Sequence, residues 1–87
     1  MTDQEKLKEL KAEIHLIDKE LVRLLNQRAD FCTELNNLRI AMGDPVRDKV
    51  DEMEIMLKLE KIADYTNMID TIYPSIFKYA GTLYSEE

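Results

Sequence analysis

The sequence has very few of the residues that interrupt helices, cross-link chains or bind metals. Its 87 residues include two glycines, two prolines, one cysteine and one histidine. The single cysteine, Cys32, excludes an internal disulfide, and the absence of a Cys/His cluster predicts no metal site. Because Gly and Pro are scarce while Leu, Glu, Lys and Ile abound, we expect an all-helical fold.

An excess of positive charge and a long apolar run are also missing. The net charge of −6 argues against a surface for nucleic acid or for anionic membranes. No apolar run approaches the roughly 18 residues of a membrane span, and the first five residues are too acidic and polar for a signal peptide. We therefore expect a cytoplasmic protein with one domain over residues 1–87 and a thin core, since so short a chain buries little surface.

An apolar seam is the main pattern that the sequence does contain. Alternate steps of three and four residues run over more than four heptads without Gly or Pro, through Leu7, Leu10, Ile14, Ile17, Leu21, Leu24, Arg28, Phe31, Leu35 and Leu38. Arg28 is the exception, because a guanidinium in an apolar stripe is costly to desolvate unless an anion meets it. The seam predicts one long helix, and Arg28 indicates that this helix binds an anion.

Three helices are expected. The first begins at Thr2 or Asp3 and runs to about Ala41, where Gly43-Asp44-Pro45 ends it. The second runs from Pro45–Asp48 to about Ala63, with Val50, Met53 and Leu57 facing inward. The third spans about 67–84, and Pro74 predicts a kink or break near Tyr73.

The helix lengths do not match, because each shorter helix covers about half of the long one. An antiparallel homodimer would cover the whole seam, whereas a monomeric three-helix bundle with a frayed end is the alternative.

A dimer would also bring cations from both chains together. Lys11 and Arg39 lie beside the seam, about 25 Å and 16 Å along the helix from Arg28 on opposite sides. The partner's Lys11 could then join Arg28 and Arg39 around a small dianion. Alternatively, Lys11 and Arg39 are solvated flanking residues of a coiled coil.

Acids cluster where the second helix begins, at Asp48, Asp51 and Glu52. Their simplest role is to stabilise the positive end of the helix dipole. The functional alternative is that Glu52 accepts a hydrogen bond from a ligand hydroxyl.

These residues together resemble the all-helical chorismate mutase family over most of the chain. The resemblance is carried by Leu10-Lys11-Ala12-Glu13-Ile14, Ile17-Asp18, Leu24-Leu25-Asn26-Gln27-Arg28, Arg39, Asp44-Pro45-Val46-Arg47-Asp48 and Glu52. It implies an intertwined, antiparallel homodimer that converts chorismate to prephenate on the route to Phe and Tyr. That rearrangement is unimolecular and pericyclic, so no cofactor is expected.

The resemblance also implies roles for individual residues. Arg28 and the partner's Lys11 would bind substrate carboxylates, and Arg39 would face the ether oxygen and a carboxylate. Asp48 and Glu52 would hold the ring hydroxyl. We accordingly expect Arg28, Arg39 and Glu52 to be catalytic.

Five positions depart from the family pattern. Asp51 stands where the family commonly has Arg, and Lys11 and Arg39 exchange the usual cation types. Tyr84 stands at the position of a family Ser that lies in the pocket, and Glu87 ends the chain one residue before a family Gln or Glu. Glu87 could replace that group if the third helix shifts.

Alternative functions follow from these departures. A non-catalytic homologue could bind a chorismate-like dianion or a partner enzyme without turnover. A similar pocket could also act on isochorismate or an amino-chorismate, for which Asp51 near an amino group is a weak indication. The remaining alternative is a coiled-coil dimerisation module without a ligand.

Overall fold

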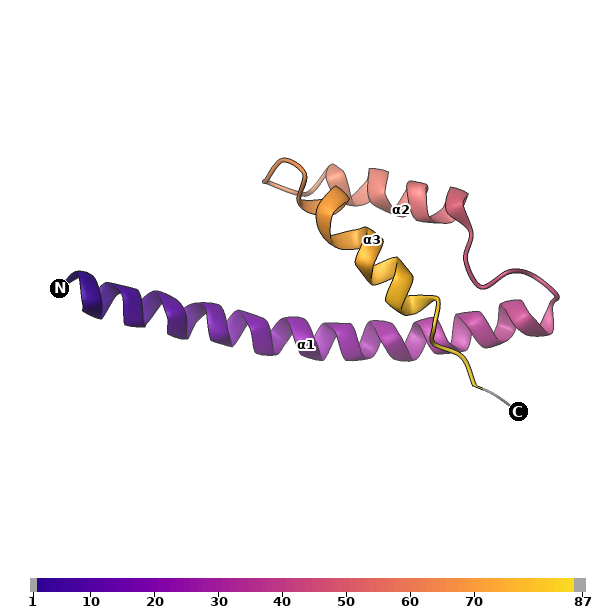
Figure 1. Ribbon diagram of the computed structural model, residues 1–87, viewed down its shortest axis with the longest axis horizontal. Coiled ribbons are helices and arrows are strands. Elements are labelled where there is room, and N and C mark those ends of the chain that lie inside the picture. Colours follow the sequence, from indigo (N-terminus) through magenta and orange to yellow (C-terminus); the bar gives the residue numbers. More distant parts are fainter. Residues whose placement is uncertain (1, 86–87) are drawn as a thin grey trace. The chain divides into compact units, whose positions relative to one another are not determined.

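The computed structural model describes residues 2–85, and this range contains three helices and no strand (Figure 1). They are α1 (Asp3–Ala41), α2 (Lys49–Glu60) and α3 (Met68–Ala80). The predicted all-helical class, with one long helix and two short ones, is confirmed. No helix within 2–85 is long and apolar enough to cross a membrane. The chain forms two units, one up to Asp30 and one from Phe31 onward.

The first unit is a single helix, the part of α1 up to Asp30. Thr2 caps it, because its Oγ1 accepts a hydrogen bond from the Glu5 amide at 3.1 Å. The seam side chains of this unit are large, apolar and between 46% and 59% exposed: Leu7, Leu10, Ile14, Ile17, Leu21 and Leu24. A stripe of this kind is typical of a helix that packs against another chain.

The end of α1 is fixed by its backbone. The Asp44 amide donates to the Arg39 carbonyl at 2.8 Å and the Gly43 amide donates to the Ile40 carbonyl at 3.0 Å. Gly43 has φ +80, the left-handed conformation that closes a Schellman motif. The end predicted from Gly43 is therefore confirmed, and the turn directs the chain into α2.

Helix α2 is shorter than predicted, since it ends at Glu60 and not near Ala63. Asp48 caps its start, as Oδ1 accepts from the amides of Val50 at 2.9 Å and Asp51 at 3.3 Å. The prediction that its apolar face points inward is wrong for the chain alone, because 63% of Val50, 63% of Met53 and 58% of Leu57 are exposed. The second unit has too few elements to cover both faces of α2.

Helix α3 runs through Pro74 as one element, so of the kink or break expected near Tyr73 the break does not occur. Proline removes a single amide donor, and buried Ile69 and Phe77 hold the turns on either side of it in place. The helix stops at Ala80, four residues earlier than predicted, and Gly81 follows it as the C-cap. Tyr84 consequently lies beyond the helix on which it was placed.

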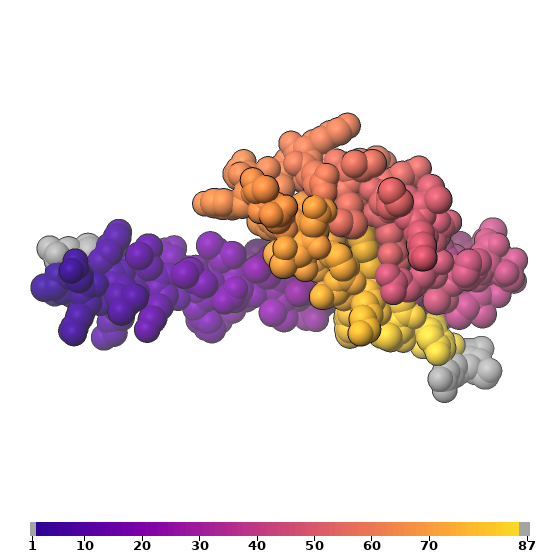
Figure 2. Space-filling view, turned by 45° about the horizontal axis from the view of Figure 1, so that its top comes forward, coloured from indigo at the N-terminus to yellow at the C-terminus, as the bar shows by residue number. Residues whose placement is uncertain are grey.

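The core of the second unit is small. Ile69 and Phe77 are 7% and 5% exposed, and Tyr73 meets Phe77 edge-on with ring centroids 5.6 Å apart. Figure 2 shows α2 and α3, coloured red to yellow, packed closely together. The buried amide of Asn36 on α1 donates to the carbonyls of Ala80 and Leu83, both at 2.8 Å. These bonds fix the end of α3 and the segment after it against the last turns of α1.

Candidate functional site

The predicted site residues are divided between the two units. Lys11 and Arg28 lie on α1 in the first unit, where Lys11 lines a surface hollow with Leu7 and Lys8. The other predicted residues lie in the second unit: Arg39, Asp48, Glu52 and Tyr84. Of these, Arg39, Asp48 and Glu52 belong to a network around the first turn of α2.

Arg39 is the cation of this network. It projects from the last turn of α1, and 21% of its side chain is exposed. Nη1 donates to the Val46 carbonyl at 2.9 Å, and Nη2 donates to Oδ2 of Asp51 at 2.8 Å. The guanidinium is therefore held between the turn after α1 and the first turn of α2. Asp51, noted in the sequence for its unexpected charge, neutralises Arg39 directly.

Glu52 is engaged by a second arginine that sequence reasoning did not single out. Arg47 donates to both carboxylate oxygens, from Nε at 2.9 Å and from Nη2 at 2.8 Å. These hydrogen bonds from Arg47, reinforced by its charge, lower the pKa of Glu52 below its usual value. Glu52 is thus an ionised acceptor, and a ligand hydroxyl would have to share it with Arg47.

The two ion pairs link the first turn of α2 to two different segments of the chain. Asp51 and Glu52 are consecutive, yet one contacts the end of α1 and the other the turn before α2. Asp48 caps the same turn. Two acids of the first turn of α2 are therefore each held by an arginine from outside the turn, and these paired charges have fixed positions.

Two asparagines that sequence reasoning missed hold the end of α3 and the segment after it, and Gly81 at that end lies against Arg47. Asn36 binds the end of α3, and Asn37 Oδ1 accepts from the Ser85 amide at 2.9 Å. A Cβ added at Gly81 would lie 2.9 Å from Cδ of Arg47, so the end of α3 rests on the arginine stem. No local pattern distinguishes these asparagines from solvated polar residues, since their partners lie more than 40 positions away in the sequence.

The family resemblance places Tyr84, as a substrate-binding residue at the position of a pocket Ser, on the third helix. Tyr84 is 45% exposed and lies in the segment after α3. Its neighbours Leu83 and Ser85 bond to α1, through Asn36 and Asn37 respectively. Glu87, proposed as a replacement group, lies outside the described residues.

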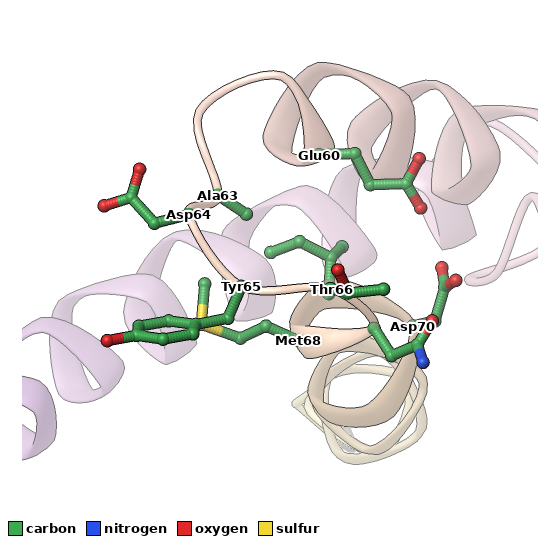
Figure 3. Close-up of a pocket in the computed structure, with 9 residues that line it drawn as sticks. Glu60, Ala63, Asp64, Tyr65, Thr66, Met68 and Asp70 are labelled. Atoms are coloured by element: carbon green, nitrogen blue, oxygen red, sulfur yellow. The ribbon is translucent and has the colours of Figure 1, made fainter.

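The carboxyl-terminal end of α2 is acidic and lies beside a pocket. A pocket of about 330 Å³ opens there, between the end of α2 and the start of α3 (Figure 3). Its lining includes three acids, Glu60, Asp64 and Asp70, and none of the predicted site residues. A hydrogen bond with Asp70, together with the charge of Asp70, raises the pKa of Glu60. Within residues 2–85 no group of three or more Asp, Glu, His or Cys side chains could hold a metal ion.

Comparison with known proteins matches most of the chain to one family. A family model described as chorismate mutase type II matches residues 10–81. A stretch of 58 residues is 36% identical to a bifunctional chorismate mutase/prephenate dehydratase of Aquifex aeolicus (strain VF5). That stretch covers 67% of this chain and only 16% of the relative. No solved structure matches the chain.

Proposed function

Since the chain belongs to the chorismate mutase type II family, we propose that it is an isomerase that rearranges chorismate to prephenate as a homodimer. The observation that carries the proposal is the placement of Arg39. In a chain of this family, its guanidinium is held beside the first turn of α2, where Asp48 and Glu52 also lie. This arrangement offers a cation for a carboxylate or ether oxygen and acids for a ring hydroxyl.

The homodimer is supported by the apolar surface of the single chain. In the first unit the seam is half exposed, and in the second unit Val50, Met53 and Leu57 form an exposed apolar face on α2. Within residues 2–85 only Ile69 and Phe77 are buried hydrophobic residues, which is a very small core for a stable monomer. A second copy carries the same two surfaces, so an antiparallel pair can cover each with the other.

The proposed pocket draws on both chains. Arg28 and Arg39 of one protomer and Lys11 of its partner would surround the substrate dianion. Cations that grip both carboxylates hold the flexible substrate in its compact reactive shape, which lowers the entropic part of the barrier. A cation at the breaking ether bond stabilises the negative charge that develops on its oxygen. Arg39, restrained by Val46 and Asp51, is the group proposed for this second role.

The test is the rate of chorismate consumption by the purified protein, followed by absorbance and checked by identifying prephenate as product. We expect saturable turnover that Arg28→Ala abolishes, while Arg23→Ala, the matched control, leaves the rate unchanged. Arg23 lies on the same helix and pairs with Glu20 at the surface. A rate equal to the uncatalysed reaction over a broad pH range would refute the proposal. Sedimentation of a monomer at assay concentration would refute the shared pocket.

A second candidate function is a binding homologue without catalysis. It is favoured by the ion pairs themselves, because Asp51 and Arg47 already engage the two groups, Arg39 and Glu52, that a substrate would use. The position of Tyr84 beyond α3 also favours this second candidate. This candidate predicts calorimetric binding of chorismate, or of a partner enzyme, with no prephenate formed.

A further inference from the structure

Asp51 is an acid in the first turn of α2 that does not cap the helix and to which the proposed function gives no contact with the substrate. Asp48 already accepts from the free amides of that turn. Asp51 instead directs Oδ2 at Nη2 of Arg39, at 2.8 Å, and 48% of its side chain is exposed. The Asp51 carboxylate thus contacts Arg39, the cation that is proposed to bind the substrate anion. This contact needs a functional explanation.

The hydrogen bonds of Arg39 supply one. A guanidinium has five N–H groups in a rigid plane. Within residues 2–85, Val46 and Asp51 take one group each, on different terminal nitrogens, and the other three make no hydrogen bond. Two anchors on different nitrogens fix the plane of the guanidinium and leave an edge for a ligand. The same contact places a negative charge beside the ligand, which weakens the attraction for any anion.

We propose that Asp51 is a positioning and specificity-determining residue: it orients Arg39 for the substrate anion and, through its charge, limits how tightly that anion is held. The inference rests on the proposed function, because it needs the dianion to bind at Arg39. It predicts two opposing effects of one side chain, and these can be separated by substitution.

Two variants separate the effects. Asp51→Asn removes the charge but keeps an oxygen that can accept from Arg39, whereas Asp51→Ala removes both. Glu54→Gln is the matched control, since it removes one negative charge from an exposed position on the same helix. Thermal unfolding of each variant, with the dimer content checked by sedimentation, reports any purely structural loss.

The readout is calorimetric binding of chorismate, with kcat and KM measured alongside. We expect Asp51→Asn to bind chorismate about fivefold more tightly, the size of one lost interaction between partly exposed charges. We expect Asp51→Ala to lose that gain and to have a lower kcat than Asp51→Asn, because its guanidinium is no longer oriented. Glu54→Gln should bind like the unaltered protein.

Three outcomes would overturn the inference. Equal tightening by Glu54→Gln would show a general effect of net charge, and equal tightening by Asp51→Ala would show charge without positioning. Unchanged chorismate affinity in Asp51→Asn, with only a lower melting temperature, would show an ion pair with a structural role alone. A failure of the proposed function looks different, since the unaltered protein itself would then bind no chorismate, and the inference would fall with it.

Discussion

The two ends of α2 carry acids in opposite electrostatic settings. At the amino end, Asp51 and Glu52 each meet an arginine, Arg39 and Arg47, at 2.8 Å. At the carboxyl end, Glu60 meets another acid, Asp70 of α3. Figure 3 shows the Glu60 and Asp70 carboxyl groups lying on the same side of the hairpin, whereas Asp64 points away from both.

The difference separates an end whose acids are paired with arginines from an end where two acids face each other. The amino end joins the end of α1, the turn after it and the end of α3, through Arg39, Arg47 and Gly81. A binding site requires side chains in fixed positions, because a cation that is displaced no longer stabilises the charge that develops in the transition state. The proposed site residues of the second unit other than Tyr84 lie at this end, while the carboxyl end combines like charges with an open pocket.

The largest expected effect is the loss of the central cation. Arg39→Gln should lower kcat for chorismate by about 10²–10³, the usual cost of removing one preorganised group that stabilises developing charge. Lys58→Gln is the control, because it removes a cation from the last turn of α2. Steady-state kinetics on both variants measures the contrast. Equal rates in the two would show that the ends of α2 do not differ in function.

Next in size is the buried amide that anchors α3. Asn36→Leu should lower the free energy of unfolding by about 2–4 kcal/mol, because the carbonyls of Ala80 and Leu83 lose their donor in a site where Asn36 is only 3% exposed. Asn37→Leu, at a more exposed amide, should cost clearly less. Denaturant unfolding of both variants provides the comparison, and equal losses would contradict the anchoring role.

Arg39 and Asn36 show which features of the site cannot be predicted from the sequence. Local rules sufficed for the number and order of the helices and for the turn at Gly43, since capping and left-handed glycine depend on neighbouring residues, but they did not give the ends of α2 and α3. The sequence predicts Arg39 as a cation beside the seam, but its pairing with Asp51 depends on how α1 and α2 approach each other. The sequence does not predict that Asn36 is buried, because a polar residue outside an apolar stripe resembles any solvated polar residue.

A smaller effect concerns acid pH and the Arg47–Glu52 pair. Arg47 lowers the pKa of Glu52, so this pair adds stability above the ordinary glutamate pKa and loses it as pH falls through the lowered value. Glu52→Gln should therefore reduce the melting temperature at neutral pH and converge with the unaltered protein in strong acid. Melting curves over pH measure this, and a constant difference would contradict it.

Gly81→Ala offers an independent way to weaken the same pair. Its φ of −65 suits alanine, but the new Cβ would lie 2.9 Å from Cδ of Arg47, so the arginine stem must move. The pKa of Glu52 should then rise towards its usual value, as followed by NMR titration of its carboxyl carbon. Gly43→Ala is an unsuitable control, because φ +80 strains any other residue there.

The smallest effect has the opposite sign and belongs to the carboxyl end of α2. Asp70 raises the pKa of Glu60, so ionised Glu60 lowers stability, fully above the raised pKa and not at all below the ordinary glutamate range. Glu60→Gln should therefore raise the melting temperature at neutral pH, with the gain vanishing in acid. Asp64→Asn, which removes a charge that points away from this pair, should give less. If Glu60→Gln instead lowered stability at neutral pH, the two ends of α2 would be electrostatically alike and the site could not be assigned to one end on this ground.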